Sequence, residues 1–436
     1  MIGPASARVV WGFSRLQIGR RDTTENILSD IIDPMLSDLT RDLAEEVLIR
    51  LPVTSNRAVR SVCKKWNSLS KGRGFTKKHL ARAKAAAARE SMVVMRISHR
   101  LYLMSINLHK GVDACINRQG KLISLDDLNR VDIYQVYHCD GLLLCVTIDE
   151  TRLVVWNPYT GQNRWFKLLP DSYGICRYNY AIGYDEISKS RRKYKVLRFG
   201  LTCHENVRCE VYYINPSKDD TTMPITINTE WDIEFYARGA SLNGNTYWFA
   251  QQLLPHPVDI SEVPDYLICY DFTTERFGQP LSLPFHSYAE DTVSLSSVRD
   301  EQLAVLYQHQ FTLRMEIWIT TKIDPQVVSW SKFYMLAVDM EPLIGQHQFD
   351  VAFASFFVDE EKKVAVVLDL ARPDSGSSLE RVAYIVGEDG YFKKEDLKGG
   401  GSDKIYHGPH VCSFVPSLAQ IKPGGKRKKS HFVKYP

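Results

Sequence analysis

The sequence has no pair of cysteines at the C-x-x-C spacing that zinc sites and thiol redox centres use. Its nine cysteines are scattered and odd in number, so we expect free thiols rather than a disulfide framework. The one N-x-[ST] triplet, which begins at Asn215, has a proline at its middle position and cannot accept an N-linked sugar. These absences favour a protein of the nucleus, the cytoplasm or both.

Long apolar runs are also missing. None approaches the about 20 residues that a membrane-spanning helix needs, so we expect no membrane partner. The net charge is only +4, which leaves local basic segments as the more informative feature. The first 21 residues carry four arginines and no acid. Transit peptides share this composition, but Gly and Pro interrupt it, and we predict a disordered tail over residues 1–36.

Signals of catalysis are scarce. His407 and His410 stand in the run HGPH without further ligands at metal spacing, so we expect structural histidines. The run KGGGS at 398–402 lacks the Lys-Ser/Thr that completes a phosphate-binding loop. Acidic residues are present, but no motif in the sequence would bring two carboxylates together as a catalytic pair. We therefore expect no catalytic residue, no metal and no cofactor.

Helical periodicity begins near residue 37. Apolar residues recur every fourth position from Leu39 to Leu51, and acids follow Thr40, which can act as the N-cap. Pro52 ends this first helix. A second helix is predicted from about Ser55, with a stripe at Val59, Val62, Cys63, Trp66 and Leu69. Alanine-rich residues 75–90 predict a third helix, whose second part, 81–90, we interpret as a linker helix.

The pattern changes at residue 91. Short segments rich in β-branched and aromatic residues follow one another, bounded by Gly, Asn, Asp or Pro, and no long helical pattern separates them. A unit of aromatic strand, turn and return strand recurs. Its aligned aromatics are Trp156, Tyr213, Tyr270 and Trp318, with a weaker copy at Tyr384. Such repeats favour an irregular β-propeller over residues 91–417. A large two-sheet sandwich is the alternative.

The front segment resembles an F-box. The positions that carry this resemblance are Leu51-Pro52, Val62-Cys63-Lys64-Lys65-Trp66, Ser68-Leu69, Phe75 and His79-Leu80. The family usually has a proline after its first leucine, where this chain has Thr40, and a more apolar start to the second helix than Asn56-Arg57-Ala58. We assign residues 37–80 to this module.

The body is similar to the F-box-associated domain of plant F-box proteins, which is related to kelch-type propellers. The segments CDGLLLC, VVWNPYTGQNRWFKL and GASLNGNTYWFA match that family's pattern. Together the two resemblances imply an α+β multidomain protein, in which a small N-terminal helical F-box precedes a large all-β domain. Residues 418–436 form a basic C-terminal tail in this scheme. Its run KRKK at 426–429 is either a nuclear-import signal or a solvated basic segment.

The resemblance implies a partner. F-boxes dock onto a Skp1-type adaptor and through it onto a cullin, which makes the chain the substrate-recognition subunit of an SCF E3 ubiquitin ligase. A helix pair this short exposes more apolar surface than it can bury alone, which also favours docking. The expected adaptor-binding residues are Leu39, Leu43, Val47, Leu48, Leu51, Pro52, Val59, Val62, Cys63 and Trp66, with Leu51 and Trp66 as the dominant contacts.

Local charge fits the same partner. Residues 39–90 hold 13 Lys or Arg and four Asp or Glu, a balance of +9 (13 − 4). The family's adaptors are acidic, so complementary charge would speed encounter. The segment lacks the interleaved aromatics or DNA-reading motifs of a nucleic-acid-binding protein, so we expect no nucleic acid partner.

The β domain is expected to hold an unknown target protein. Its loops carry no recognisable code, and the region from Tyr247-Trp248 through Gln251–Pro264 is one candidate rim, with Trp248 itself expected in the core. Two alternatives remain open. One is an F-box interaction protein that works outside any ligase, which the Thr40 departure keeps in view. The other is a β-propeller enzyme with a helical appendage.

Overall fold

The computed structural model describes most of the chain in two compact units, Met1–Arg89 and Glu90–Pro436. The described residues are 40–51, 60, 63–89, 91–97, 99–107, 115–121, 131–168, 175, 177–188, 191–202, 206–217, 224–253, 263–288, 290–299, 301–371, 379–397 and 408–422. The predicted tail over 1–36 lies outside them. No helix within these ranges is long and apolar enough to span a membrane.

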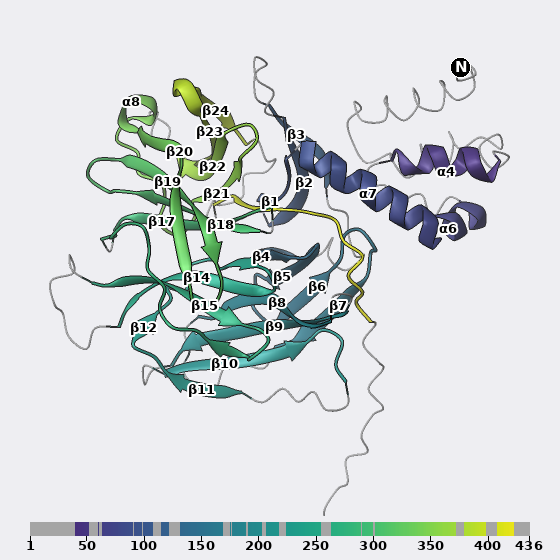
Figure 1. Ribbon diagram of the computed structural model, residues 1–436, viewed down its shortest axis with the longest axis horizontal. Coiled ribbons are helices and arrows are strands. Elements are labelled where there is room, and N and C mark those ends of the chain that lie inside the picture. Colours follow the sequence, from purple (N-terminus) through teal and green to yellow (C-terminus); the bar gives the residue numbers. More distant parts are fainter. Residues whose placement is uncertain are drawn as a thin grey trace, which may run out of the picture. The chain divides into compact units, whose positions relative to one another are not determined.

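The first unit contains three described helices (Figure 1). Their bounds are α4, Arg41–Ile49; α6, Lys64–Ser70; and α7, Arg73–Arg89. Thr40 is the N-cap of α4, as the sequence predicts, and its hydroxyl accepts a hydrogen bond from the amide of Leu43. Helix α7 is continuous through residue 80, so the expected boundary between module and linker helix falls inside one helix.

The second predicted helix differs from the structure at Cys63. This residue is extended, with φ −156° and ψ 163°, and its sulfur accepts a hydrogen bond from the amide of Trp66 at 3.4 Å. It therefore caps a new helix, and the predicted stripe does not run through it as one helical face. The other predicted start, near Ser55, lies outside the described residues.

The second unit is a β-propeller of six antiparallel sheets, or blades. In chain order the first three are β4–β7 (Ile133–Cys139, Leu142–Thr147, Arg152–Trp156, Asn163–Lys167), β8–β11 (Asn179–Ser188, Arg191–Leu201, Asn206–Tyr213, Ile225–Asn228) and β12–β16 (Trp231–Asp232, Ala240–Leu242, Asn245–Gln252, Asp265–Asp271, Arg276–Phe277). The next two are β17–β20 (Thr292–Val298, Gln302–Gln308, Arg314–Ile323, Val328–Asp339) and β21–β24 (Ser355–Asp359, Val364–Ala371, Glu380–Gly387, Phe392–Asp396). Two short helices, α8 (Glu341–Ile344) and η4 (Glu388–Gly390), lie in connections.

The sixth blade joins the two ends of the propeller domain. Strands β1 (Ser91–Ile97), β2 (Arg100–Asn107) and β3 (Cys115–Lys121) are completed by β25 (His410–Ser413) in the order β25-β1-β2-β3. The last described strand of the chain thus hydrogen-bonds to the first, with Val93 opposite Ser413 and Arg96 opposite His410. This pairing closes the ring and gives β1 a hydrogen-bonded strand on both sides.

The hydrophobic core lies between blades rather than in one central mass. Each of the six pairs of neighbouring blades shares its own buried apolar cluster, as Leu144 with Ile182 and Phe199 with Trp248 illustrate. Strands such as β5, where every residue is buried, are covered on both faces and read as continuous apolar runs. The propeller prediction is confirmed, and the sandwich alternative is excluded because no blade packs face to face with a single partner.

The sequence repeat marks equivalent positions in the blades. Trp156 lies on β6, Tyr213 on β10, Tyr270 on β15, Trp318 on β19 and Tyr384 on β23. In each of these blades this is the third strand counted from the inner edge. In the blade β12–β16, where β12 and β13 share the innermost position, the third strand is β15, next to β14. The irregular spacing arises from connections of unequal length.

The run CDGLLLC forms a tight hairpin. The even separation of Cys139 and Cys145 predicts that both lie on one face of a single strand. Asp140 and Gly141 instead reverse the chain with positive φ values of 48° and 73°, so the two buried cysteines lie on β4 and β5 in different clusters. At Gly141 a Cβ would also meet the backbone nitrogen of Ser417 at 2.7 Å, so only glycine fits.

The predicted start of the basic tail at residue 418 also differs from the structure. Residues 414–422 lie along the first blade, and Ile421 is buried beside its apolar cluster. The buried side chain of Asn157 organises this contact: its amide donates to the carbonyls of Ser417 and Ala419, at 3.2 and 2.9 Å. The propeller domain therefore extends at least to residue 422. The rest of the tail, including KRKK, lies outside the described residues.

Candidate functional site

The helical unit has a small core of its own. Ala44, Leu48, Trp66, Leu69 and Phe75 are buried together, and Ile49, Leu51 and Cys63 pack against them. Trp66 and Leu48 are each 1% exposed. The structure thus places two of the predicted adaptor-binding residues inside the module, where they support its shape and offer little surface to a partner.

His79 completes this core, a role that the sequence did not reveal. Its side chain is 1% exposed, stacks on Phe75 and donates from Nε2 to the carbonyl oxygen of Leu51 at 3.0 Å. Burial lowers the pKa of the imidazole, an effect that the bond to Leu51 partly offsets. A neutral histidine therefore joins α7 to the end of α4.

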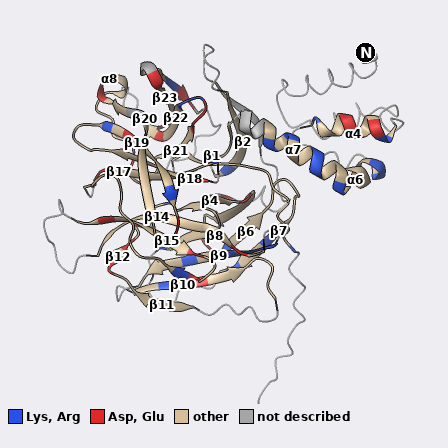
Figure 2. Cartoon of the chain, viewed as in Figure 1, with Lys and Arg blue, Asp and Glu red and all other residues tan. Residues whose placement is uncertain are grey.

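The surface of the unit offers one apolar face and many cations. Leu43 is 48% exposed, and Val47, one turn later on α4, is half-buried. Of the other predicted contacts, Leu51 and Cys63 are half-buried, and Leu39, Pro52, Val59 and Val62 lie outside the described residues. Basic residues are spread along α6 and α7 (Figure 2). Those that are exposed here are Lys64, Lys65, Lys71, Arg73, Lys77, Lys78, Arg82 and Lys84.

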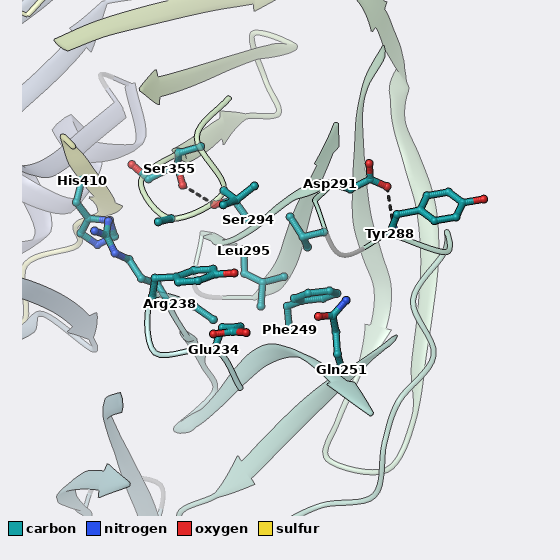
Figure 3. Close-up of a pocket in the computed structure, with 16 residues that line it drawn as sticks. Glu234, Arg238, Phe249, Gln251, Tyr288, Asp291, Ser294, Leu295, Ser355 and His410 are labelled. Carbon is teal, nitrogen blue, oxygen red and sulfur yellow. Dashed lines mark hydrogen bonds between the residues drawn. The ribbon is translucent and has the colours of Figure 1, made fainter. Parts of the chain in front are cut away.

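The propeller contains a cavity at the end where its inner strands begin (Figure 3). Its volume is about 50 Å³, room for several water molecules or one small ion. The lining comes from the connection between β12 and β13, the start of β17, the end of β14, the residues before β21, and His410 of β25. We call this space the channel cavity.

The divided inner edge of the third blade supplies part of the lining. Strands β12 and β13 both pair with β14, and residues 233–239 leave the sheet between them. Glu234, Tyr236 and Arg238 project from this loop into the lining. Trp248, which begins the candidate rim region but is expected in the core, is fully buried and contacts Phe199 edge to face. Its predicted place in the core is confirmed. Gln251 of the same candidate rim does line the cavity; residues 254–262 lie outside the described ranges.

A row of aromatic side chains starts near the channel cavity, where Tyr288 is part of the lining. His286, Tyr288, His309 and Phe311 follow one another with ring centroids 5.7 to 5.8 Å apart; His309 is half-buried and the other three are exposed. Phe311 is 81% exposed, the highest value among the large apolar side chains recorded as exposed, and Tyr288 also lines the cavity. We call these four residues the aromatic strip.

The two loops that carry the strip are fixed by one carboxylate. Asp291 accepts hydrogen bonds from the amides of Tyr288 and Gln310 and from the hydroxyl of Tyr307, at 2.8 to 2.9 Å. Because three donors hold this side chain, the strip is a preformed surface. No periodic pattern in the sequence marks the strip, since its members come from two segments about 20 residues apart.

Within the described ranges, no three His, Cys, Asp or Glu side chains gather as metal ligands could. Six described cysteines form no disulfide; one of them is Cys145, whose thiol pKa is raised by burial. Burial disfavours the thiolate that a nucleophile needs.

Comparison with known proteins identifies both units. The family model described as F-box associated beta propeller domain matches residues 92–421, and the F-box domain model matches residues 36–78. The F-box/kelch-repeat protein At3g16740 of Arabidopsis thaliana is 52% identical over 402 residues, which cover 88% of this chain and 99% of that protein. The putative F-box protein At3g17620 of the same plant is 51% identical over 400 residues, covering 91% and 98%.

Among solved structures, a chain of a nidogen/laminin complex aligns with a TM-score of 0.37 at 11% identity, over 74% of this chain and 98% of that one. The sequence relationships are far closer, and they extend over the helical unit and the propeller alike. This chain belongs to the family of F-box proteins that carry an F-box-associated β-propeller.

Proposed function

We propose that this F-box protein is the substrate-recognition subunit of an SCF ubiquitin ligase. Its helical unit binds a Skp1-type adaptor, the adaptor binds a cullin, and the propeller binds a target protein. The observation that carries the proposal is the combination of an F-box with a separate propeller in one chain.

The F-box surface supports adaptor docking. Leu43 and Val47 form an apolar face on α4 that the module's own core does not cover, and burial of such a face against a groove is favourable. The exposed cations of α6 and α7 match the acidic adaptor that the family resemblance implies. Leu48 and Trp66 act indirectly, by holding α4 and α6 together.

The aromatic strip supports target binding at the cavity end of the propeller. Exposed aromatic groups contribute large contact areas at low entropic cost and often dominate interface energy. Phe311 and Tyr288 are presented by loops that Asp291 fixes, so little ordering remains to be done on binding. Catalysis then needs no residue of this chain, because the ligase holds a target lysine near ubiquitin loaded on its conjugating enzyme.

The test is co-purification of the full-length protein with a Skp1-type adaptor and a cullin. Leu43→Glu is expected to weaken adaptor binding at least ten-fold, because it places a carboxylate on the apolar face opposite an acidic partner. The matched control is Ile187→Glu, which alters an isoleucine that is 52% exposed on the propeller.

Three results would count against the proposal in different ways. Failure of the folded wild-type protein to bind the adaptor would contradict F-box docking. Adaptor binding without cullin in the complex would indicate an F-box protein that acts outside a ligase. Equal loss of binding in both variants would show that Leu43 has no specific part in the interface.

A further inference from the structure

Ring closure places two buried nitrogen-rich side chains next to each other. Arg96 of β1 and His410 of β25 are direct partners in the closing sheet. Arg96 is 1% exposed; its Nη2 donates to the carbonyl of Gly408 at 2.5 Å, and its Nε is buried with no hydrogen-bond partner. His410 is 8% exposed; its Nε2 donates to the carbonyl of Val136 at 3.1 Å, and its Nδ1 has no partner.

Arg238 approaches His410 from another blade. It lies on the loop between β12 and β13, and Figure 3 shows its side chain directed toward His410. Its Nη1 is buried without a hydrogen-bond partner. Arg238 and His410 therefore bring unsatisfied nitrogen atoms to the lining of the cavity: Arg238 Nη1 is a donor, and His410 Nδ1 is an acceptor in the neutral ring. Arg96 is not part of the lining but lies next to His410 in the sheet.

Within the described part of the chain, neither Arg96 nor Arg238 forms an ion pair with a carboxylate. Asp350 attracts Arg238 from a longer distance, and its carboxylate already accepts hydrogen bonds from the amides of Ala352 and Phe353. Asp291 lines the far side of the cavity and is already engaged by three donors from its own loops, and Glu234 is exposed. Buried guanidinium groups are normally paired, because removing them from water without a counter-charge is costly.

Burial and mutual repulsion both disfavour the charged forms of Arg96, Arg238 and His410. Burial, with the neighbouring Arg238 and Arg381, lowers the pKa of Arg96 to about 9. Burial, with Arg238 and Arg96, holds the pKa of His410 well below its usual range. Burial also lowers the pKa of Arg238. Arginine keeps its proton at neutral pH, so these guanidinium groups stay charged and the folded protein bears the cost.

We propose that the channel cavity is a binding site for a small oxyanion, a carboxylate or phosphate group held by Arg238 beside His410. Guanidinium groups bind such oxygens through charge-assisted hydrogen bonds, and Arg238 Nη1 supplies a free donor at the lining. The volume of about 50 Å³ is enough for one such group. The site does not depend on a ligase role.

The experiment titrates the full-length protein with inorganic phosphate and, separately, with acetate, at constant ionic strength maintained with chloride. Thermal unfolding and calorimetry are expected to show saturable binding of at least one anion. Arg238→Met is expected to weaken that binding about ten-fold or more, which corresponds to one lost hydrogen bond to a charged group. In the absence of anion, Arg238→Met should unfold at the same temperature as wild type or higher, because it removes an unpaired buried charge.

The control is Arg276→Met, which removes an exposed arginine of β16 and should bind the anion as wild type does. Saturation by phosphate alone identifies a tetrahedral ligand, and saturation by acetate identifies a carboxylate; either supports the site. If Arg238→Met does not fold, Arg238→Lys takes its place and should weaken binding through loss of the planar fork. No saturable response to either anion, or an equal response in wild type and the Arg238 variant, overturns the proposal.

Discussion

The Nε2 atom of His79 lies 3.0 Å from the carbonyl oxygen of Leu51, so α7 is hydrogen-bonded to a residue just beyond the C-cap of α4. The imidazole is buried and its pKa is lowered, first by burial. A neutral ring is therefore part of the folded state, while the unfolded chain takes up a proton below about pH 6.5.

The sign of the resulting pH dependence follows from this difference. Above about pH 6.5 the contribution of His79 is fully present, and it is lost progressively as the pH falls toward the lowered pKa of the folded state. His79→Gln retains a donor for Leu51 but does not titrate. We expect the amides of α4 and α7 in wild type to exchange hydrogen faster at pH 5.5 than at 7.5, after correction for intrinsic rates, and the variant to lose this dependence. An unchanged pH dependence in the variant would contradict the assignment.

Substitutions at Trp66 and Leu43 should distinguish residues needed for folding of the helical unit from residues needed for adaptor binding. Trp66→Ala empties a filled position in the small core, and we expect it to cost about 3–5 kcal/mol and to unfold the helical unit. Leu43→Ala should change stability by less than about 0.5 kcal/mol and still weaken adaptor binding. Circular dichroism and hydrogen exchange of the full chain report folding, and adaptor pull-down reports docking. A folded Trp66→Ala protein that fails to bind would instead make Trp66 a direct contact.

Asn157 should fix the segment 414–422 to the first blade. Its amide donates to the carbonyls of Ser417 and Ala419, and its carbonyl oxygen accepts from the amides of Tyr159 and Thr160. Asn157→Ala leaves these buried groups without partners, and we expect about 3 kcal/mol or more of destabilisation in urea unfolding. Asn157→Asp keeps the acceptor and loses the donor, so it should preserve the turn and release the segment to limited proteolysis. Protection of the segment as strong as in wild type, in either variant, would show that other contacts hold it.

Phe311 should contribute to target binding and little to stability. Because its ring is 81% exposed, Phe311→Ala should leave the melting temperature within about 1 °C of wild type. We expect the variant to recover less target protein in co-purification, by several-fold. Phe235→Ala, another exposed aromatic of the same domain that lies outside the strip, is the control. Identical recovery from both variants and wild type would remove the aromatic strip from the interface.

Much of the fold could be predicted from local pattern. Strands of a propeller are covered by neighbouring blades, so they appear as short apolar runs, and the aligned aromatics from Trp156 to Tyr384 fall on equivalent strands. Turns were harder. The even spacing of Cys139 and Cys145 suggested one strand because the reversal at Asp140-Gly141 depends on positive φ values that periodicity does not report.

The candidate sites were less predictable, because they combine residues far apart in sequence. Nothing local to α4 indicates that Leu48 faces Trp66 while Leu43 faces solvent; the packing of all three helices decides it. Arg96 is visible in the sequence as a single cation within the apolar strand SMVVMRI. Its partners, His410 and Arg238, come together only when the ring closes and the loop between β12 and β13 turns inward.

The pairing of β25 with β1 sets an order of events during synthesis. Arg96 contacts Gly408 across 312 residues, so β1 waits for its inner neighbour until nearly the whole propeller has left the ribosome. Contacts over such distances form late and slowly. Throughout that interval the nascent chain exposes an unpaired strand edge, the feature that promotes association between chains and attracts chaperones. A premature stop codon that removes about the last 30 residues would delete β25 and leave the edge of β1 unpaired in every copy of the protein. Such a short truncation would therefore affect closure of the whole propeller.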